Sequence, residues 1–173
     1  MIAQKGGKEK GENGENCLDT WKGGVYNETI ETNSIKKKEV FSLKKTFGAQ
    51  FVETIPGKRV IKSGAVGSTN VEEVRWLIKT LVDNAGGWKT KGWGYIVDIS
   101  KMSPVTPDVG QELVSLHQKL TAAGCKAMAF VDFGSFVTAA QAKQHQQQSK
   151  VGIQEGHFKT EKDALAWIDT IVK

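Results

Sequence analysis

Hydroxyl and carboxylate side chains gather in one short stretch of the chain, GYIVDISKMSPVTPDVGQEL, over residues 94–113. An apolar run at its start predicts a buried strand, and its second half has the pattern of a capped amphipathic helix. In open α/β sheets, ligands and partners bind where a strand passes into a helix. We therefore predict a partner-binding surface on this loop and helix start, with six candidate residues: Ser100, Met102, Ser103, Thr106, Asp108 and Val109.

Two further carboxylates, Asp98 and Asp132, stand at the ends of two apolar runs. If both runs are parallel strands, the two side chains reach the same edge of the sheet, where paired carboxylates could serve a hydrolase as acid and base. The simpler interpretation, which we favour, is that each carboxylate caps a loop or a helix N-terminus.

The histidines and cysteines do not form a catalytic or metal-binding pattern. His117, His145 and His157 fall on different predicted elements, without the spacing of metal ligands. We place His117 at the boundary of an apolar helix stripe and expect a structural role for His157. Cys125 begins an apolar strand, where cysteine acts as a small hydrophobe. We therefore expect no metal, no cofactor and no enzymatic activity.

An aromatic cluster precedes and enters the strand of the first motif, with Trp88, Trp93 and Tyr95 close together in sequence. Exposed Trp and Tyr side chains make effective binding anchors. Packing in the core, or a cover over the open face of the sheet, is the alternative that we favour.

The whole chain of 173 residues is 39% hydrophobic and 25% charged, which fits one globular domain with an appendage. No apolar run approaches the ~18 residues of a membrane helix, and the N-terminus lacks the apolar region of a secretory signal. The two cysteines, Cys17 and Cys125, are far apart, so we expect no disulfide and a reducing, cytoplasmic setting.

The net charge of +5 is spread over both halves of the chain, and a nucleic-acid partner is therefore not expected. One basic cluster occurs in the sequence IKKKEVFSLKK, at residues 35–45. It could bind phosphates or anionic lipid, but a solvated linker is the interpretation that we favour. Residues 1–45 lack helical or strand periodicity, and we predict a disordered polar tail there, followed by one domain over 46–173.

Hydrophobic periodicity divides the domain into alternating elements. It predicts five strands, over 49–55, 59–66, 92–100, 125–133 and 152–160, and four helices, over 67–87, 106–124, 135–150 and 160–173. The helices are expected to begin at Thr69 with Glu72, at Thr106, and at Thr160 with Asp163. A hairpin followed by strand–helix alternation implies a mixed, mostly parallel sheet.

This order and two motifs resemble those of the STAS domains, and more closely their SpoIIAA-like, anti-sigma-factor antagonist-like relatives. YIVDISKM resembles the family's apolar strand ending in Asp-x-Ser before a loop and helix. GHFKTEKDALAWI is similar to its aromatic strand followed by a helix with Ala-x-x-Trp. The resemblance covers residues 46–173. It implies an α/β sandwich with a mostly parallel sheet of about five strands, an N-terminal hairpin and about four helices, in a bacterial protein.

The resemblance also implies a regulatory protein–protein interaction module, with a kinase-like or sigma-factor regulator as partner. In the family's anti-sigma-factor antagonists, the same loop carries an Asp-Ser-Ser-Gly whose serine is phosphorylated. Aligning Asp98 and Ser100 with the family's Asp-x-Ser places Pro107, which has no hydroxyl, at that serine. We therefore do not expect this phosphorylation, and we assign the neighbouring Thr106 to helix capping. Two alternatives stay open: a carrier or sensor of a small apolar, lipid-like ligand, and an uncharacterised hydrolase-type enzyme.

Overall fold

The computed structural model describes residues 44–132, 140–144, 147 and 152–173. These residues form one sheet in which every strand lies beside its neighbours in sequence, in the order β1-β2-β3-β4-β5-β6. The strands are β1 (Lys44–Phe47), β2 (Gln50–Thr54), β3 (Val60–Ala65), β4 (Trp93–Asp98), β5 (Cys125–Val131) and β6 (Gln154–Phe158). The helices are α1 (Val71–Ala85), α2 (Pro107–Ala122) and α4 (Glu161–Ile171), with a 3-10 turn η1 (Gly86–Trp88) after α1.

The sheet is antiparallel at its beginning and parallel in the rest. Strands β1, β2 and β3 form an antiparallel meander, and β3 to β6 pair in parallel. The predicted hairpin is therefore confirmed as β2–β3. Strand β1 is an addition: the sequence analysis placed its first residues, Lys44 and Lys45, in the tail. Its four residues, KKTF, contain a single large apolar side chain, too little to show a strand period.

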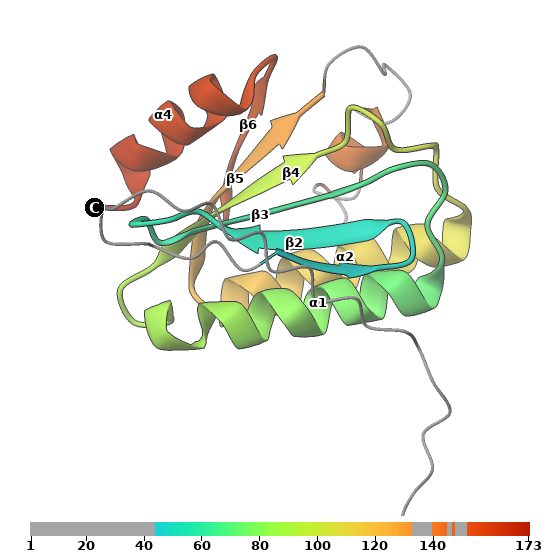
Figure 1. Cartoon of the computed structure of the whole chain (residues 1–173), viewed down its shortest axis with the longest axis horizontal. Helices are drawn as coiled ribbons and strands as arrows, with labels where there is room; N and C mark the ends of the chain where they lie inside the picture. The colour runs from blue at the N-terminus through green and yellow to red at the C-terminus, as the bar shows by residue number, and fades with distance from the viewer. Residues whose placement is uncertain (1–43, 133–139, 145–146, 148–151) are drawn as a thin grey trace, which may run out of the picture.

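Helices cover both faces of the sheet (Figure 1). Helices α1 and α2 lie below it in this view and α4 lies above. Residues 140–144 are helical and belong to the α1/α2 side, where Ala142 packs against the core. The rest of the predicted helix over 135–150 lies outside the described residues, except for the helical residue 147. The prediction of a disordered tail likewise concerns residues outside the described part.

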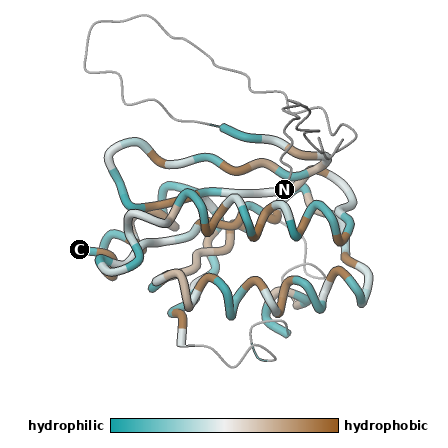
Figure 2. Tube along the Cα trace, turned by 90° about the horizontal axis from the view of Figure 1, so that it is seen from below, coloured by the Kyte–Doolittle hydropathy of each residue, from teal (hydrophilic) through white to brown (hydrophobic). Residues whose placement is uncertain are grey.

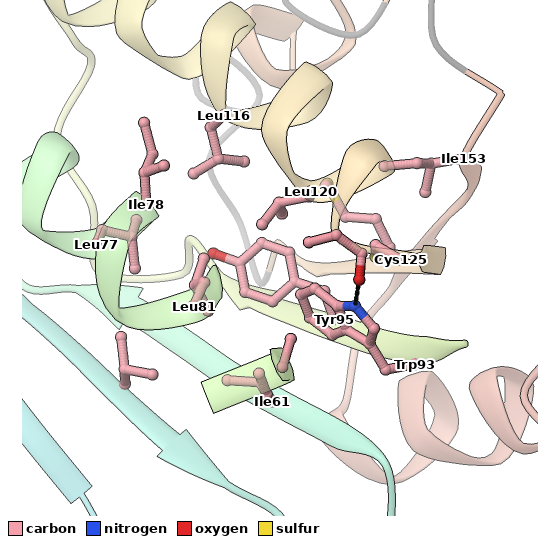
Figure 3. Packing of buried hydrophobic residues seen from close by; sticks show 14 of the residues in the cluster. Ile61, Leu77, Ile78, Leu81, Trp93, Tyr95, Leu116, Leu120, Cys125 and Ile153 are labelled. Atoms are coloured by element: carbon pink, nitrogen blue, oxygen red, sulfur yellow. Dashed lines mark hydrogen bonds between the residues drawn. The ribbon is translucent and has the colours of Figure 1, made fainter. Parts of the chain in front are cut away.

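The main core lies between the sheet and α1/α2. Trp93 and Tyr95 are its largest side chains, with exposed fractions of 0% and 1% (Figure 3). The indole Nε1 of Trp93 donates a hydrogen bond to the carbonyl of Ala123 at 2.9 Å. Trp88 is half-buried against the same cluster. Core packing is thus the correct interpretation of the aromatic cluster.

The alternation of side chains along β4 gives the sheet a second, smaller core under α4. Ile96 points to this side and is fully buried with Ile168 of α4. Gly94 permits the close approach of α4, because a Cβ at this position would lie 2.3 Å from Cγ2 of Ile168. Figure 2, which views the molecule from the α1/α2 side, shows hydrophobic and hydrophilic residues alternating along these two helices.

Helix α1 begins one residue later than the sequence predicted. Its N-cap is Asn70, whose side chain accepts a hydrogen bond from the backbone N–H of Glu73 at 2.9 Å, so the predicted box of Thr69 and Glu72 is wrong. The hydroxyl of Thr69 instead accepts a bond from Gln50 Nε2 and donates one to Glu73 Oε2, both at 2.9 Å. Thr69 is thus engaged with strand β2, a contact that local sequence does not reveal.

Helix α4 begins as predicted. The hydroxyl of Thr160 accepts a hydrogen bond from the backbone N–H of Asp163 at 3.1 Å and donates one to its carboxylate at 2.8 Å. None of the helices in the described ranges is long and apolar enough to cross a membrane.

Candidate functional site

The candidate site is the loop over residues 99–106, which leaves the carboxyl end of β4 and leads into α2. Its backbone is joined to the neighbouring β3–α1 loop at Gly67, whose N–H donates to Lys101 O and whose carbonyl accepts from Ser103 N, both at 2.9 Å. A β-bridge pairs Gly67 with Met102. Gly67 has a φ of +82°, a conformation that glycine adopts without strain. The loop is thereby fixed to the end of β3.

A second clamp holds the far end of the loop. The side-chain amide of Gln141 donates a hydrogen bond to the carbonyl of Val105 and accepts one from its N–H, both at 3.2 Å. One side-chain amide thus satisfies both backbone polar groups of Val105. The sequence analysis did not identify Gln141, because the contact is made across 36 positions of the chain.

Asp98 shapes the beginning of the loop. Its Oδ1 accepts hydrogen bonds from the backbone N–H and the hydroxyl of Ser100, at 3.1 Å and 2.5 Å. Such a turn, in which an Asp side chain bonds its own backbone two residues on, is a common way to leave a strand. Asp98 therefore acts as a loop cap, as the simpler interpretation of the sequence expected.

Asp132 has a different partner on the other face of the sheet. Its Oδ2 lies 2.8 Å from Nδ1 of His157, whose ring stacks on Phe130 with a centroid distance of 5.1 Å. Because Asp98 pairs with Val131 in the register of β4 and β5, Asp132 is one residue further along and alternation places it on the opposite face. The two carboxylates consequently do not form the acid–base pair that the hydrolase interpretation requires.

The start of α2 departs from the prediction in two ways. Thr106 occupies the N-cap, but its hydroxyl makes no bond to the helix backbone and donates to the carboxylate of Asp108 instead. This bond, together with the N–H of Val109, lowers the pKa of Asp108. Val109 itself is 1% exposed and belongs to the core. Its predicted contact with a partner is therefore not available on the folded surface, because the first apolar residue of the helix stripe faces the sheet.

The remaining predicted residues lie at or near the surface. Ser100, Met102 and Ser103 are half-buried, whereas Thr106 and Asp108 are exposed. The sequence analysis did not identify Val66, which lies beside this loop and is 63% exposed. Among the described residues, it is the one large hydrophobic residue that is exposed. The sequence hardly indicates this exposure, because Val66 differs from the buried strand residues before it only by its position at the strand end.

A small cavity lies beneath the loop, between the sheet and the helices. Its volume is about 60 Å³, and its lining includes Ser63 and Tyr95 of the sheet, Met102 and Val105 of the loop, and His117 of α2. Sites for drug-sized ligands enclose roughly 300–1,000 Å³. The cavity is therefore much smaller than a site for an acyl chain.

The other reactive residues are buried. His117 is 4% exposed, so its predicted boundary position is wrong. Cys125 is a free thiol that is also 4% exposed, and burial raises its pKa to about 12, which suits a structural cysteine rather than a nucleophile. His145 and Cys17 lie outside the described residues. In the part of the chain that the structure describes, no three His, Cys, Asp or Glu side chains are arranged to hold a metal ion.

No protein-family model matches the chain, and a search of curated proteins gives no match. Among solved structures, an uncharacterised protein of the DUF3478 family from Shewanella loihica, described as having a SpoIIAA-like fold, is similar over 84% of this chain and 97% of its own. The two chains are 16% identical, with a TM-score of 0.51.

Two other solved structures show weaker similarity. An anti-sigma factor antagonist from Mycobacterium paratuberculosis is 13% identical with a TM-score of 0.47, over 69% of this chain and 92% of its own. SpoIIAA in its unphosphorylated form is 14% identical with a TM-score of 0.47, over 70% and 97%. Likeness at such identities concerns the fold and not the function. This chain has a SpoIIAA-like fold, as the resemblance in sequence predicted, with six strands in place of the expected five.

Proposed function

We propose that this chain is a non-enzymatic module that binds a partner protein through the loop after β4 and the start of α2. The docking surface, as we define it, consists of Val66, Ser100, Lys101, Met102, Ser103, Pro104, Thr106 and Asp108. The observation that carries the proposal is the set of hydrogen bonds that join the loop backbone to Gly67 and to Gln141, while side chains such as Lys101 and Pro104 are exposed. A preformed surface loses little entropy when it binds.

The composition of the docking surface suits a protein partner. Val66 supplies an exposed apolar side chain, and Lys101 and Asp108 add one charge of each sign at exposed positions. An apolar centre with a polar rim is typical of protein interfaces. From the resemblance in sequence, we propose a kinase-like or sigma-factor regulator as the partner class.

Control of this surface by phosphorylation at the family's position is not part of the proposal. Pro107 stands at that position, and the adjacent Thr106 already donates its hydroxyl to the carboxylate of Asp108. A phosphate on Thr106 would place a second anion against this carboxylate, which is unfavourable.

The structure offers less support for the two alternatives. The cavity beneath the loop, at about 60 Å³, is too small to hold a lipid-like ligand. The separate partners of Asp98 and Asp132 do not favour a hydrolase. We therefore do not extend the proposal to either.

Photo-crosslinking in the source cell tests the docking surface. A photoreactive amino acid is placed at Ser68, which is exposed beside Val66, or at Lys162 on α4 as a matched control. We expect one partner protein to crosslink from position 68 and not from position 162. The variant Val66→Asp/Lys101→Glu should remove at least nine-tenths of that crosslink without changing the thermal unfolding midpoint by more than a few degrees.

Two results would contradict the proposal. The same set of proteins crosslinked from both positions would indicate non-specific contact. A crosslink that survives the double substitution would show that the partner does not use this surface.

A further inference from the structure

Two ionisable side chains face each other in the interior, between the sheet and α2. His117 projects from α2 and Glu155 from the edge strand β6, and each side chain is only 5% exposed. His117 Nε2 lies 3.5 Å from Glu155 Oε1. The register pairs Glu155 with Met128, a core residue on the α1/α2 side, which confirms that the glutamate points inward under α2.

The hydrogen bonds of the imidazole fix where its protons are. Nδ1 of His117 lies 2.8 Å from the carbonyl oxygen of Leu113, and a carbonyl only accepts, so Nδ1 carries a hydrogen. A neutral ring then has a lone pair on Nε2. Among the described residues, Nε2 and both carboxyl oxygens of Glu155 have no hydrogen-bond partner.

This arrangement is unfavourable unless one more proton is present. A carboxylate facing a lone pair in the interior is a buried, uncompensated charge, which costs several kcal/mol. A single proton between Nε2 and the carboxyl group replaces that repulsion with a hydrogen bond, after the two atoms approach by a few tenths of an ångström. We infer that His117 and Glu155 form a buried binding site for a single proton, and that this proton holds the edge strand β6 against α2.

The surroundings support a neutral, protonated pair. Burial raises the pKa of Glu155 to about 7 and lowers the pKa of His117, so both side chains prefer their neutral forms and the shared proton resides on the glutamate. From β5, Cys125 is the nearby titratable group, and its raised pKa of about 12 keeps it a neutral thiol.

The other charged groups near the pair are engaged or lie elsewhere. Lys126 of β5 is exposed and lies at the irregularity in the register of β4 and β5. The next side chain of β6 on this face, His157, is bonded to Asp132 at 2.8 Å. In the described ranges, no cation is therefore bonded to Glu155 to compensate its charge once the proton is lost.

Strand β6 is the element that we expect to separate when the proton is lost. In the described sheet it has a neighbour on one side only, β5, so it can separate without breaking other ladders. Edge elements of this kind open locally at a lower free-energy cost than the centre of a sheet. Opening brings the glutamate to water, where its pKa returns towards the usual 4.5.

Two measurements on the intact chain test the proton site. The first is an NMR titration of the wild-type protein, following the ¹³C carboxyl signal of Glu155 and the ¹⁵N signals of His117. We expect one common step near pH 7 at both residues. A Glu155 midpoint near the ordinary value of about 4.3 would overturn the inference, whatever the variants do.

The second measurement is amide hydrogen exchange of β6 in the wild type and in Glu155→Gln, whose amide imitates the protonated carboxyl. We expect the ratio of the two opening constants to rise by up to about tenfold per pH unit between pH 4.5 and 7, and to stay constant above pH 7. Amides of β3 and the variant Glu72→Gln, at an exposed position of α1, serve as controls and should show no such rise. An unchanged ratio across this range would show that the proton does not hold β6.

Discussion

At the scale of single residues, the hydroxyls of Ser63 and Tyr95 are the polar pair that the main core must satisfy. Both residues are 1% exposed, and their oxygens are hydrogen-bonded to each other. Removing one hydroxyl, by Ser63→Ala or Tyr95→Phe, leaves the other without this partner, which costs about 1–3 kcal/mol of unfolding free energy. The double variant should cost about 1 kcal/mol less than the sum of the single ones. Urea unfolding of all four proteins measures this coupling, and strict additivity would contradict it.

The same scale shows where reasoning from sequence fails. Asp98 and Asp132 were correctly located at strand ends, but a register offset of one residue decides that they face opposite sides. The sequence analysis assigned Val109 to a partner, although it begins the apolar stripe of α2 and is buried. It placed His117 at the boundary of that stripe, although His117 is buried too, because α2 is covered along more of its circumference than the stripe suggests. Registers and covered faces depend on contacts between distant segments, which one sequence does not contain.

At the scale of elements, two helix starts with the same cap residue should respond differently to mutation. The hydroxyl of Thr160 accepts a backbone hydrogen bond at the start of α4, whereas that of Thr106 makes no such bond at the start of α2. Thr160→Ala should therefore lower the free energy of unfolding by about 1 kcal/mol. Thr106→Ala should change it by only a few tenths, since Pro107 still favours the helix. Chemical denaturation compares the two, and equal losses would contradict the assignment.

Most elements were predictable because their periodicity is long and regular. Helix α2 has one apolar stripe between a capping threonine and a terminal glycine, and β4 and β5 are continuous apolar runs. Strand β1 was not predictable. It is short and carries two lysines, and a strand at an edge needs little hydrophobic pattern of its own.

At the scale of the whole molecule, the buried pair gives the stability a defined dependence on pH. Because the pKa of Glu155 is raised, its contribution is fully present below pH 4.5 and is lost as the pH rises through 7. Because the pKa of His117 is lowered, its contribution is present above pH 6.5 and is lost as the pH falls. Between pH 4.5 and 6.5 the two dependences oppose each other, and from pH 6.5 to 7 that of Glu155 acts alone.

We therefore expect the wild type to lose stability, relative to His117→Phe/Glu155→Met, between pH 5.5 and 8. The double variant removes both ionisable groups, so the difference isolates their contribution. Urea unfolding at pH 5.5 and 8 gives the two values needed. A relative stability of the wild type that climbs steadily to pH 8 would contradict the assignment of the pair.

The overall architecture followed from the sequence because each level of pattern agrees with the next. Alternating strands and helices imply parallel pairing with crossovers, and the motif YIVDISKM marks the strand and loop that the structure places at the carboxyl end of β4. The docking surface could be located to a loop but not to its details. Gln141 and Gly67 hold its backbone by hydrogen bonds. These bonds join residues that are far apart in sequence, so no local pattern predicts them.

The strict succession of strands from β1 to β6 has a consequence for biosynthesis. A ribosome releases the chain from its N-terminus, so every strand that emerges finds its pairing neighbour already made. Among the six described strands, none has to wait for a later one to be inserted between two earlier ones. At every stage, the strand made last is the edge to which the next strand pairs. The sheet of the nascent protein can therefore grow one strand at a time, without a rearrangement at the end of synthesis.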